Sequence, residues 1–343
     1  MLATTPVDVS IIVVSYNTRA MTAAALTSIQ AETRACSYEV IVVDNASTDG
    51  SAEMIAHHPL QPARMALSEN IGFARANNRA VLDARGRYVL LLNPDTIVLD
   101  AAIDRLVAFA DANRNARIWG GRTVFADGRL NPASCWSRMT AWTLYCRTSG
   151  LAVLFANSAF FNGEAIGGWR RNTVRHVDIV SGCFFLIERK VWDRLNGFDP
   201  AFFMYGEEAD LCLRARELSA RPMITPNATI VHYGGASEPV RADKMVRLLT
   251  AKMTLIMRHW TPMSVPLGRA LLSSWPLSRR LAMALAALVS SDDRIASSAA
   301  TWREVWHRRS EWRWGYLAAD SPPVQTAAAP TQHRSQILAR SDT

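Results

Sequence analysis

The 343-residue sequence contains few cysteines, and none of them is paired with another at CxxC spacing. The five cysteines are odd in number and scattered along the chain. This distribution argues against a disulfide framework and against a structural zinc site. We therefore expect reduced thiols in a cytoplasmic protein.

Long apolar runs and targeting signals are also missing. The longest uncharged apolar run, residues 281–289, is far shorter than the ~20 residues that span a bilayer. The first residues carry neither a basic region nor an apolar core, so we expect no signal peptide. No GxGxxG motif follows an apolar run, so the usual fingerprint of a dinucleotide-binding protein is absent.

The net charge of +8 is unevenly distributed. Residues 1–240 are neutral, whereas residues 241–343 carry 15 Lys and Arg against 7 Asp and Glu, with six of the eleven tryptophans. Arg beside Trp favours a membrane surface. Nucleic acid is a rival partner, but no recognised nucleic-acid-binding motif accompanies the charge. A solvated basic surface, or a helical subdomain with packed tryptophans, is the remaining interpretation.

Apolar runs alternate with helical composition through the first hundred residues. The runs are residues 9–14, 39–43, 64–67 and 88–92. This alternation predicts an α/β fold with a right-handed, mostly parallel, Rossmann-like sheet. Each run is followed by a polar loop, and the carboxyl ends of parallel strands share one edge of the sheet. Ligands bind at that edge in open α/β sheets.

Asp95 occupies a central position at this edge. Residues 88–92 are continuously apolar, as in a strand buried on both faces, and Pro94 ends the strand because proline cannot donate to the ladder. A carboxylate there can hold a divalent cation, and the cation can hold a diphosphate. The alternative is a simple Asn-Pro-Asp turn before the next helix.

A second acidic group opens a predicted helix over residues 207–218. Glu207, Glu208 and Asp210 suit a helix N-terminus, which stabilises acids through the helix dipole. Asp210 and Arg214 are spaced as an i,i+4 ion pair. Glu208 lies on a partly apolar face, where a carboxylate can act as a general base.

Three later regions depart from this alternation of apolar runs and helical composition. Residues 131–172 are rich in Trp, Phe and small residues without a clear period, which is typical of substrate loops. Residues 241–317 have helical patterns, and we expect them to form a separate basic, Trp-rich, membrane-associating region. Residues 318–343 are rich in Ala, Pro, Ser and Thr and are predicted to be disordered.

The chain resembles a family 2 inverting glycosyltransferase of the GT-A fold, in its rhamnosyltransferase-like branch. Six stretches in family order carry the resemblance, within about residues 8–240: Val14-Ser15-Tyr16-Asn17, residues 43–51, residues 69–78, Leu92-Asn93-Pro94-Asp95, Ser181-Gly182-Cys183-Phe184 and residues 197–214. Residues 1–240 would then form the catalytic domain. Each stretch is weak alone, but together they are specific.

The resemblance implies a nucleotide-sugar site. Asp44 matches the acid that accepts a hydrogen bond from the imide N–H of a pyrimidine base. Ser15, Tyr16 and Asn17 would line the same base, and Arg75 would lie near the base or diphosphate. An Asp-Asn turn and a solvated helix arginine are the structural alternatives for Asp44 and Arg75.

The resemblance also implies a metal site and a base. Asn93-Pro94-Asp95 matches the family's DxD motif with Asn in place of the first acid, which leaves Asp95 as the main ligand of Mg²⁺ or Mn²⁺. His232 resembles the histidine that completes this site. Glu208 matches the catalytic base, although it is one methylene longer than the usual Asp, and Asp210 is its nearest rival.

The implied reaction is inverting sugar transfer in bacterial cell-surface polysaccharide synthesis. The best-matched donor is dTDP-L-rhamnose, with UDP-sugars second. The expected acceptor is a saccharide or a polyprenyl-diphosphate-linked saccharide, on the inner face of the cytoplasmic membrane. Two other classes compete: a sugar-nucleotide nucleotidyltransferase, which would need a glycine-rich loop after the first strand, and an inactive sugar-binding scaffold.

Overall fold

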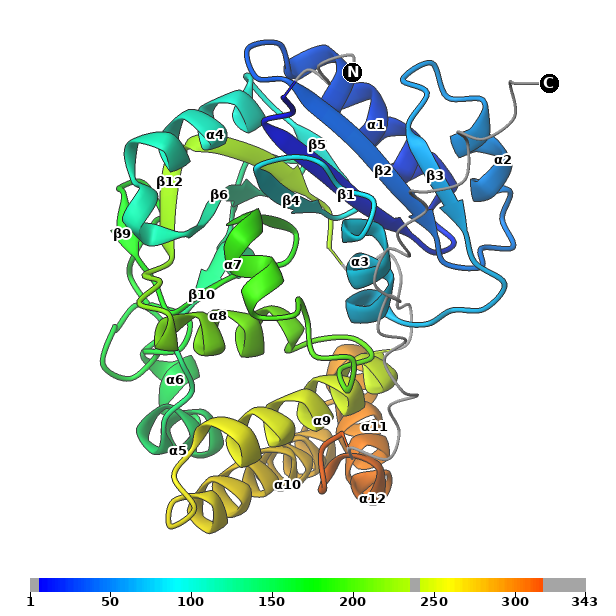
Figure 1. Ribbon diagram of the computed structural model, residues 1–343. Coiled ribbons are helices and arrows are strands. Elements are labelled where there is room, and N and C mark those ends of the chain that lie inside the picture. Colours follow the sequence, from blue (N-terminus) through cyan, green and yellow to red (C-terminus); the bar gives the residue numbers. More distant parts are fainter. Residues whose placement is uncertain (1–5, 235–240, 317–343) are drawn as a thin grey trace, which may run out of the picture.

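A computed structural model describes residues 6–234 and 241–316 (Figure 1). Its main sheet contains the strands β1 Val9–Ser15, β2 Tyr38–Asp44, β3 Ala63–Ala66, β4 Tyr88–Leu92, β5 Thr96–Val98, β6 Ile118–Val124, β7 Leu130–Asn131, β9 Arg175–His176, β11 Phe184–Glu188 and β12 Met223–His232. A separate pair contains β8 Cys135–Trp136 and β10 Ile179–Val180.

The helices cover both faces of this sheet and form a layer below it (Figure 1). They are α1 Arg19–Glu32, α2 Ser51–Ala56, α3 Phe73–Val81, α4 Ala102–Ala112, α5 Ala141–Ser149, α6 Leu151–Leu154, α7 Arg189–Arg194, α8 Glu207–Glu217, α9 Arg241–His259, α10 Val265–Val289, α11 Asp293–His307 and α12 Arg309–Trp312.

The strand order is β3-β2-β1-β4-β11-β6-β12-β5 in the described residues. The first four strands are parallel, and so are β6 and β12, whereas β11 and β5 run antiparallel to their neighbours. The prediction of a mostly parallel α/β sheet is therefore confirmed. The first half of the sheet has its strand carboxyl ends along one edge, as a ligand-binding edge requires.

Strand β4 is buried on both faces, as the sequence predicts. Val89 and Leu91 pack into one core with α3, α7 and α8, whereas Tyr88, Leu90 and Leu92 pack into a second core with α1 and α4. Alternate side chains of a strand point to opposite faces, so a strand inside two cores must be apolar throughout. The rigid end of β4 positions the loop that carries Asp95.

A third core lies in the C-terminal helices. It joins Leu144 of α5 to residues of α9, α10, α11 and α12. Trp275 and Trp312 are buried in it, and Trp260, Trp302 and Trp306 are partly buried against it, whereas Trp314 is 46% exposed. The packing interpretation therefore accounts for most of these tryptophans, and they are not a surface band of indole rings.

Three sequence predictions have different outcomes in the remaining regions. Residues 131–172, where we placed no elements, contain β8, α5 and α6. The five cysteines are free, as expected. The predicted disordered tail, residues 318–343, lies outside the described residues.

Candidate active site

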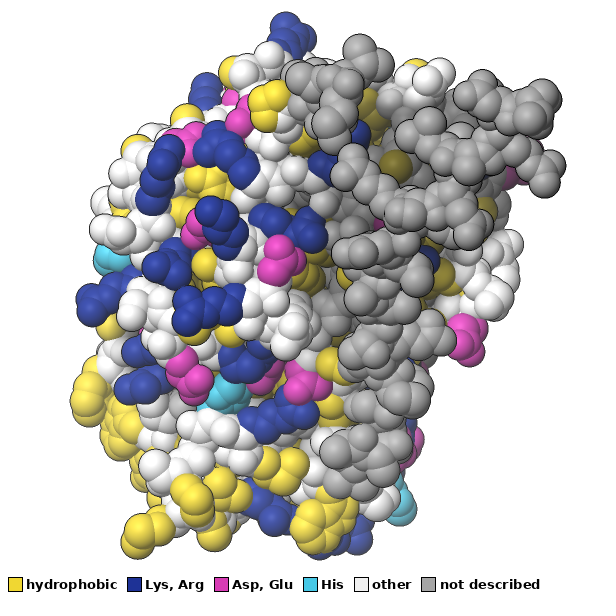
Figure 2. Space-filling view, in the orientation of Figure 1, with side chains coloured by type: hydrophobic (Ala, Val, Ile, Leu, Met, Phe, Trp, Pro, Cys, Tyr) yellow, Lys and Arg dark blue, Asp and Glu magenta, His cyan; other side chains and the backbone are white. Residues whose placement is uncertain are grey.

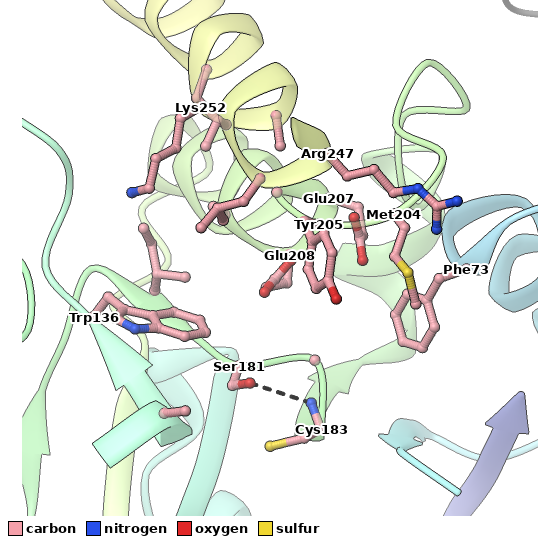
Figure 3. Close-up of a pocket in the computed structure, with 18 of the residues that line it drawn as sticks. Phe73, Trp136, Ser181, Cys183, Met204, Tyr205, Glu207, Glu208, Arg247 and Lys252 are labelled. Atoms are coloured by element: carbon pink, nitrogen blue, oxygen red, sulfur yellow. Dashed lines mark hydrogen bonds between the residues drawn. The ribbon is translucent and has the colours of Figure 1, made fainter. Parts of the chain in front are cut away.

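A cavity of about 1420 Å³ lies between the strand ends and the helical layer below them (Figure 3). Its lining comes from the polar loops of the sheet edge, from α8 and α9, and from residues 131–141. Glu207 and Glu208 project into the cavity near Tyr205, and Trp136 and Lys252 lie across from them (Figure 3). The cavity therefore brings together most of the chemistry that the sequence predicts.

Asp95 and His232 meet in this cavity. Thr96 in β5 pairs with His232 at the end of β12, so the sheet register brings the two side chains together. Asp95 Oδ1 lies 3.5 Å from His232 Nε2, and Asp95 Oδ2 accepts a hydrogen bond from the Gly234 N–H at 3.0 Å. Asn93 Nδ2 is also 3.5 Å from His232 Nε2. The three residues of the predicted metal site are therefore neighbours.

Asp95 and His232 each shift the pKa of the other so that the charged form is favoured. Burial raises the pKa of Asp95, but the hydrogen bond and charge of His232 outweigh it and hold the pKa below its ordinary value. Burial lowers the pKa of His232, whereas the neighbouring Cys183 and Asp95 raise it to about 10. Asp95 is therefore an anion at neutral pH, as a metal ligand must be, whereas His232 holds a proton that it would release on binding a cation.

The donor set of this site fits a cation that is shared with a substrate. In the described part of the chain, no three His, Cys, Asp or Glu side chains cluster closely enough to hold a metal ion. Mg²⁺ typically takes one or two protein carboxylates and completes its octahedron with water and substrate phosphates. One carboxylate and one imidazole facing a cavity therefore suit a metal–diphosphate complex better than a closed protein cage.

Glu207 and Glu208 begin α8, directly after Gly206, whose φ of 90° turns the chain into the helix. Each glutamate has a buried Oε2 that finds no hydrogen-bond partner among the described residues. Burial raises the pKa of both carboxyls, and the charge of Glu208 adds to the rise at Glu207. An unpartnered carboxylate with a raised pKa beside a cavity is the arrangement of a general base.

Asp210 faces away from the cavity. It is 1% exposed, its Oδ2 accepts a hydrogen bond from Arg214 Nε at 2.7 Å, and its Oδ1 accepts one from His259 Nε2 at 2.8 Å. Burial raises the pKa of Asp210, but His259 and Arg214 outweigh it and lower the pKa. The i,i+4 ion pair that the sequence predicts is therefore formed, and Asp210 is occupied by structural partners.

The residues predicted to line the pyrimidine of the nucleotide divide into two groups. Tyr16 lines the cavity, but the Ser15 hydroxyl is buried against Thr18 and Thr22 at 3.2 and 3.0 Å. Asn17 Oδ1 accepts a hydrogen bond from the Thr48 N–H at 2.8 Å. Ser15 and Asn17 are therefore bonded within the loop and its neighbour, and of the three residues only Tyr16 lines the cavity.

Asp44 ends β2 beside this loop. Its Oδ2 accepts a long hydrogen bond, 3.3 Å, from the Ser47 N–H, and its buried Oδ1 has no partner within the described residues. A buried carboxylate oxygen without a donor is costly, so this atom suits a ligand N–H. Its neighbour Asn45 lines the cavity directly.

Arg75 is directed to another part of the fold. Its Nε donates a hydrogen bond to the Pro200 carbonyl at 3.0 Å, which ties α3 to the loop before α8. The role in nucleotide binding that the resemblance implies for Arg75 stays a prediction.

Sequence reasoning missed a charged group on the far wall of the cavity. Glu164 accepts hydrogen bonds from Lys252 and from Arg147, and these cations lower its pKa to about 2 against the opposing effect of burial. Lys252 also lowers the pKa of Glu208. One signal was present, because Glu164 is the only acid in residues 131–177.

Comparison with known proteins gives one family and several relatives. A sequence model of the family described as "Glycosyl transferase family 2" matches residues 10–194. The succinoglycan biosynthesis protein ExoO of Rhizobium meliloti is 33% identical over 260 residues, which cover 74% of this chain and 69% of that protein.

Two further relatives are more distant or much longer. The N-acetylglucosaminyl-diphospho-decaprenol L-rhamnosyltransferase of Mycobacterium tuberculosis H37Rv is 23% identical over 57% of this chain and 66% of its own length. The O-antigen biosynthesis protein RfbC of Myxococcus xanthus is 27% identical over 63% of this chain, but the match spans 16% of that protein.

The solved structures confirm the fold. A mannosyltransferase from Pyrobaculum calidifontis, solved in complex with GDP-Man and Mn²⁺, superposes with a TM-score of 0.53 at 19% identity. The superposition covers 90% of this chain and 86% of that one. Such similarity extends to the arrangement of the sheet and helices, and it supports the GT-A fold that the sequence predicts.

Proposed function

The chain belongs to glycosyl transferase family 2 and is a glycosyltransferase, and we propose that it transfers L-rhamnose from dTDP-L-rhamnose with inversion at the sugar carbon. The acceptor in this proposal is a saccharide or a polyprenyl-diphosphate-linked saccharide used for a bacterial cell-surface polysaccharide. UDP-sugars are the second donor class, because Asp44 could accept a hydrogen bond from the imide N–H of uracil as well as from that of thymine.

One observation carries the proposal. A carboxylate with an unpartnered oxygen, Glu208, shares a cavity with the Asp95–His232 pair. Inverting transfer needs a base on the acceptor side and charge neutralisation on the leaving-group side, with room for a sugar between them. The two groups lie on opposite elements, α8 and the end of β4, which leaves that room.

The chain's residues then have defined tasks. Glu208 takes the proton from the acceptor hydroxyl, whose oxygen attacks the anomeric carbon from the face opposite the diphosphate. Asp44 accepts a hydrogen bond from the pyrimidine of the nucleotide, and the ring of Tyr16 packs beside that pyrimidine. Asp95 and His232 would hold Mg²⁺ or Mn²⁺, and such a cation would neutralise the charge of the leaving nucleoside diphosphate.

The names of the relatives support the proposed acceptor and the proposed location at a membrane. One relative's name specifies a diphospho-decaprenol acceptor and L-rhamnose, and two others are named for O-antigen biosynthesis and succinoglycan biosynthesis. A polyprenyl acceptor is confined to a bilayer, so we place the enzyme as a peripheral protein on the inner face of the cytoplasmic membrane. Among residues 6–234 and 241–316, no helix is both long and apolar enough to cross a bilayer.

The test is a donor screen with purified enzyme. dTDP-L-rhamnose and a set of UDP-sugars are incubated with extracted bacterial lipid and a divalent cation, and products are identified by mass spectrometry. The proposal expects a mass increase of one deoxyhexose from dTDP-L-rhamnose alone. Transfer from a UDP-sugar instead would replace the donor, and release of pyrophosphate from a sugar phosphate and dTTP would indicate a nucleotidyltransferase.

A further inference from the structure

Helices α5 and α6 and the second half of α10 leave many hydrophobic side chains uncovered. Figure 2 shows hydrophobic side chains along the lower left and lower edges, where Figure 1 places α5, α6 and α10. We define the apolar surface as the exposed hydrophobic residues of these segments and of the turns that follow α6: Trp142, Tyr145, Val153, Leu154, Phe155, Phe160, Leu281, Leu285, Leu288 and Val289. Leu154 is 74% exposed and Val289 is 88% exposed.

The exposure in α10 follows a helical stripe. Leu281, Leu285 and Leu288 are spaced four and three residues apart, so they lie on one face of the helix. The other half of the helix packs differently, because Leu272 and Trp275 are buried in the third core. A stripe of leucines that are 55%, 66% and 82% exposed is the pattern of a helix that rests on an apolar phase.

The two parts of the apolar surface are held together by hydrogen bonds. The Ser278 hydroxyl donates to the Thr148 carbonyl at 2.8 Å, and Arg279 donates to the Arg147 carbonyl at 2.9 Å. Thr148 in turn donates to the Leu271 carbonyl at 3.0 Å. The end of α5 is thus fixed against α10, at the point where α6 begins and where the leucine stripe begins.

The charge of these segments has one sign. Residues 141–163 and 265–289 contain four arginines and no Asp, Glu or Lys, and one of the four, Arg147, is paired with Glu164. Arg279 and Arg280 directly precede the leucine stripe, and Arg147 lies beside Arg279. Basic groups near an anionic bilayer are attracted to it electrostatically.

The apolar surface also adjoins the mouth of the cavity. Met139, Thr140, Ala141 and Arg147 line the cavity, and α5 begins at Ala141. A bilayer that contacts the outer face of α5 would therefore lie next to the acceptor side of the active site. An acceptor whose lipid tail stays in the bilayer could reach Glu208 from there.

We infer that this apolar surface is an interfacial membrane-docking site, and that its partner is a bilayer containing anionic lipid. The site uses aliphatic and aromatic side chains of α5, α6 and α10 for insertion and arginines for charge attraction, rather than the C-terminal tryptophans, most of which are packed. The link to a lipid-linked acceptor rests on the proposed function. The docking itself does not, because it needs no nucleotide sugar.

The test is flotation of the full-length protein with vesicles of neutral phosphatidylcholine, with or without phosphatidylglycerol. Binding should require phosphatidylglycerol and weaken as salt increases. Leu154→Asp and Leu285→Asp should each lower vesicle binding by ~10-fold or more, because each replaces an exposed leucine that would insert into the bilayer by a charge of the same sign as the anionic lipid. The matched control is Leu82→Asp, at a 58% exposed leucine directly after α3, which should bind like the parent.

Folding and catalysis are checked separately from docking. Circular dichroism and hydrolysis of the nucleotide sugar in solution should be the same for the three variants and the parent. Failure of hydrolysis in every protein would refute the proposed function and leave the vesicle result standing. Unchanged flotation of both Asp variants, binding independent of lipid charge, or a stable dimer that buries this surface in light scattering would overturn the docking site.

Discussion

Asp210 accepts a hydrogen bond from His259 Nε2 at 2.8 Å, and this bond fastens α8, which carries Glu208, to α9 of the C-terminal region. Arg214 holds the other oxygen of Asp210 from within α8. We therefore propose that Asp210, the rival of Glu208 for the role of general base, is a positioning residue. It couples the C-terminal helices to the catalytic helix, although it is only two residues from Glu208.

Replacing Asp210 should mainly reduce stability. Asp210→Asn leaves Arg214 and His259 without their anionic partner, and we expect the free energy of unfolding to fall by about 2 kcal/mol, less than for a fully buried pair because both partners are partly exposed. Urea denaturation measures this change. At urea concentrations below the unfolding transition, the turnover of the variant should stay within about tenfold of the parent, because Glu208 is still present to accept the proton.

The acid side of the pH–rate profile should report the raised pKa of Glu208. A general base works only when deprotonated, so the rate should increase as pH rises through this pKa, above the ~4.3 of an ordinary glutamate. Lys252 lowers the pKa of Glu208, so Lys252→Met should move this limb to higher pH, whereas Lys252→Arg should restore it. A limb that stays in place in Lys252→Met would show that another group titrates.

Removal of the cation should abolish transfer and weaken donor binding. Asp95→Asn removes the carboxylate charge while keeping the size of the side chain, so the dependence of nucleotide binding on Mg²⁺ or Mn²⁺ should disappear. Isothermal titration of the nucleoside diphosphate, with and without EDTA, measures this for parent and variant. Full transfer activity in EDTA would contradict a metal held by Asp95 and His232.

The sequence predicted those parts of the site that depend on local order along the chain. Strand β4, the Asp95 loop and the start of α8 follow from apolar runs and the residues that end them. Residues that meet only through the tertiary fold were not predictable. Lys252 and Glu164 are 88 positions apart, and no local pattern indicates that they share a wall of the cavity.

The loop after β1 shows another limit of sequence reasoning. Ser15, Tyr16 and Asn17 are adjacent and polar, so the motif predicts the same contact with the nucleotide for all three. In the fold only Tyr16 lines the cavity, because Ser15 points into the helix packing and Asn17 bonds to the neighbouring loop. A motif gives the residues of a loop, but the direction of each side chain depends on what the loop packs against.

The measurement that tests the account most directly is the rate of sugar transfer in single-turnover experiments with Glu208→Gln and Asp210→Asn beside the parent enzyme. We predict that Glu208→Gln lowers the rate by ~10²–10⁴-fold while dTDP-L-rhamnose binding, measured by titration, is retained. Asp210→Asn should transfer within about tenfold of the parent rate. The opposite result, a large loss in Asp210→Asn with Glu208→Gln active, would contradict the assignment of Glu208 as the base.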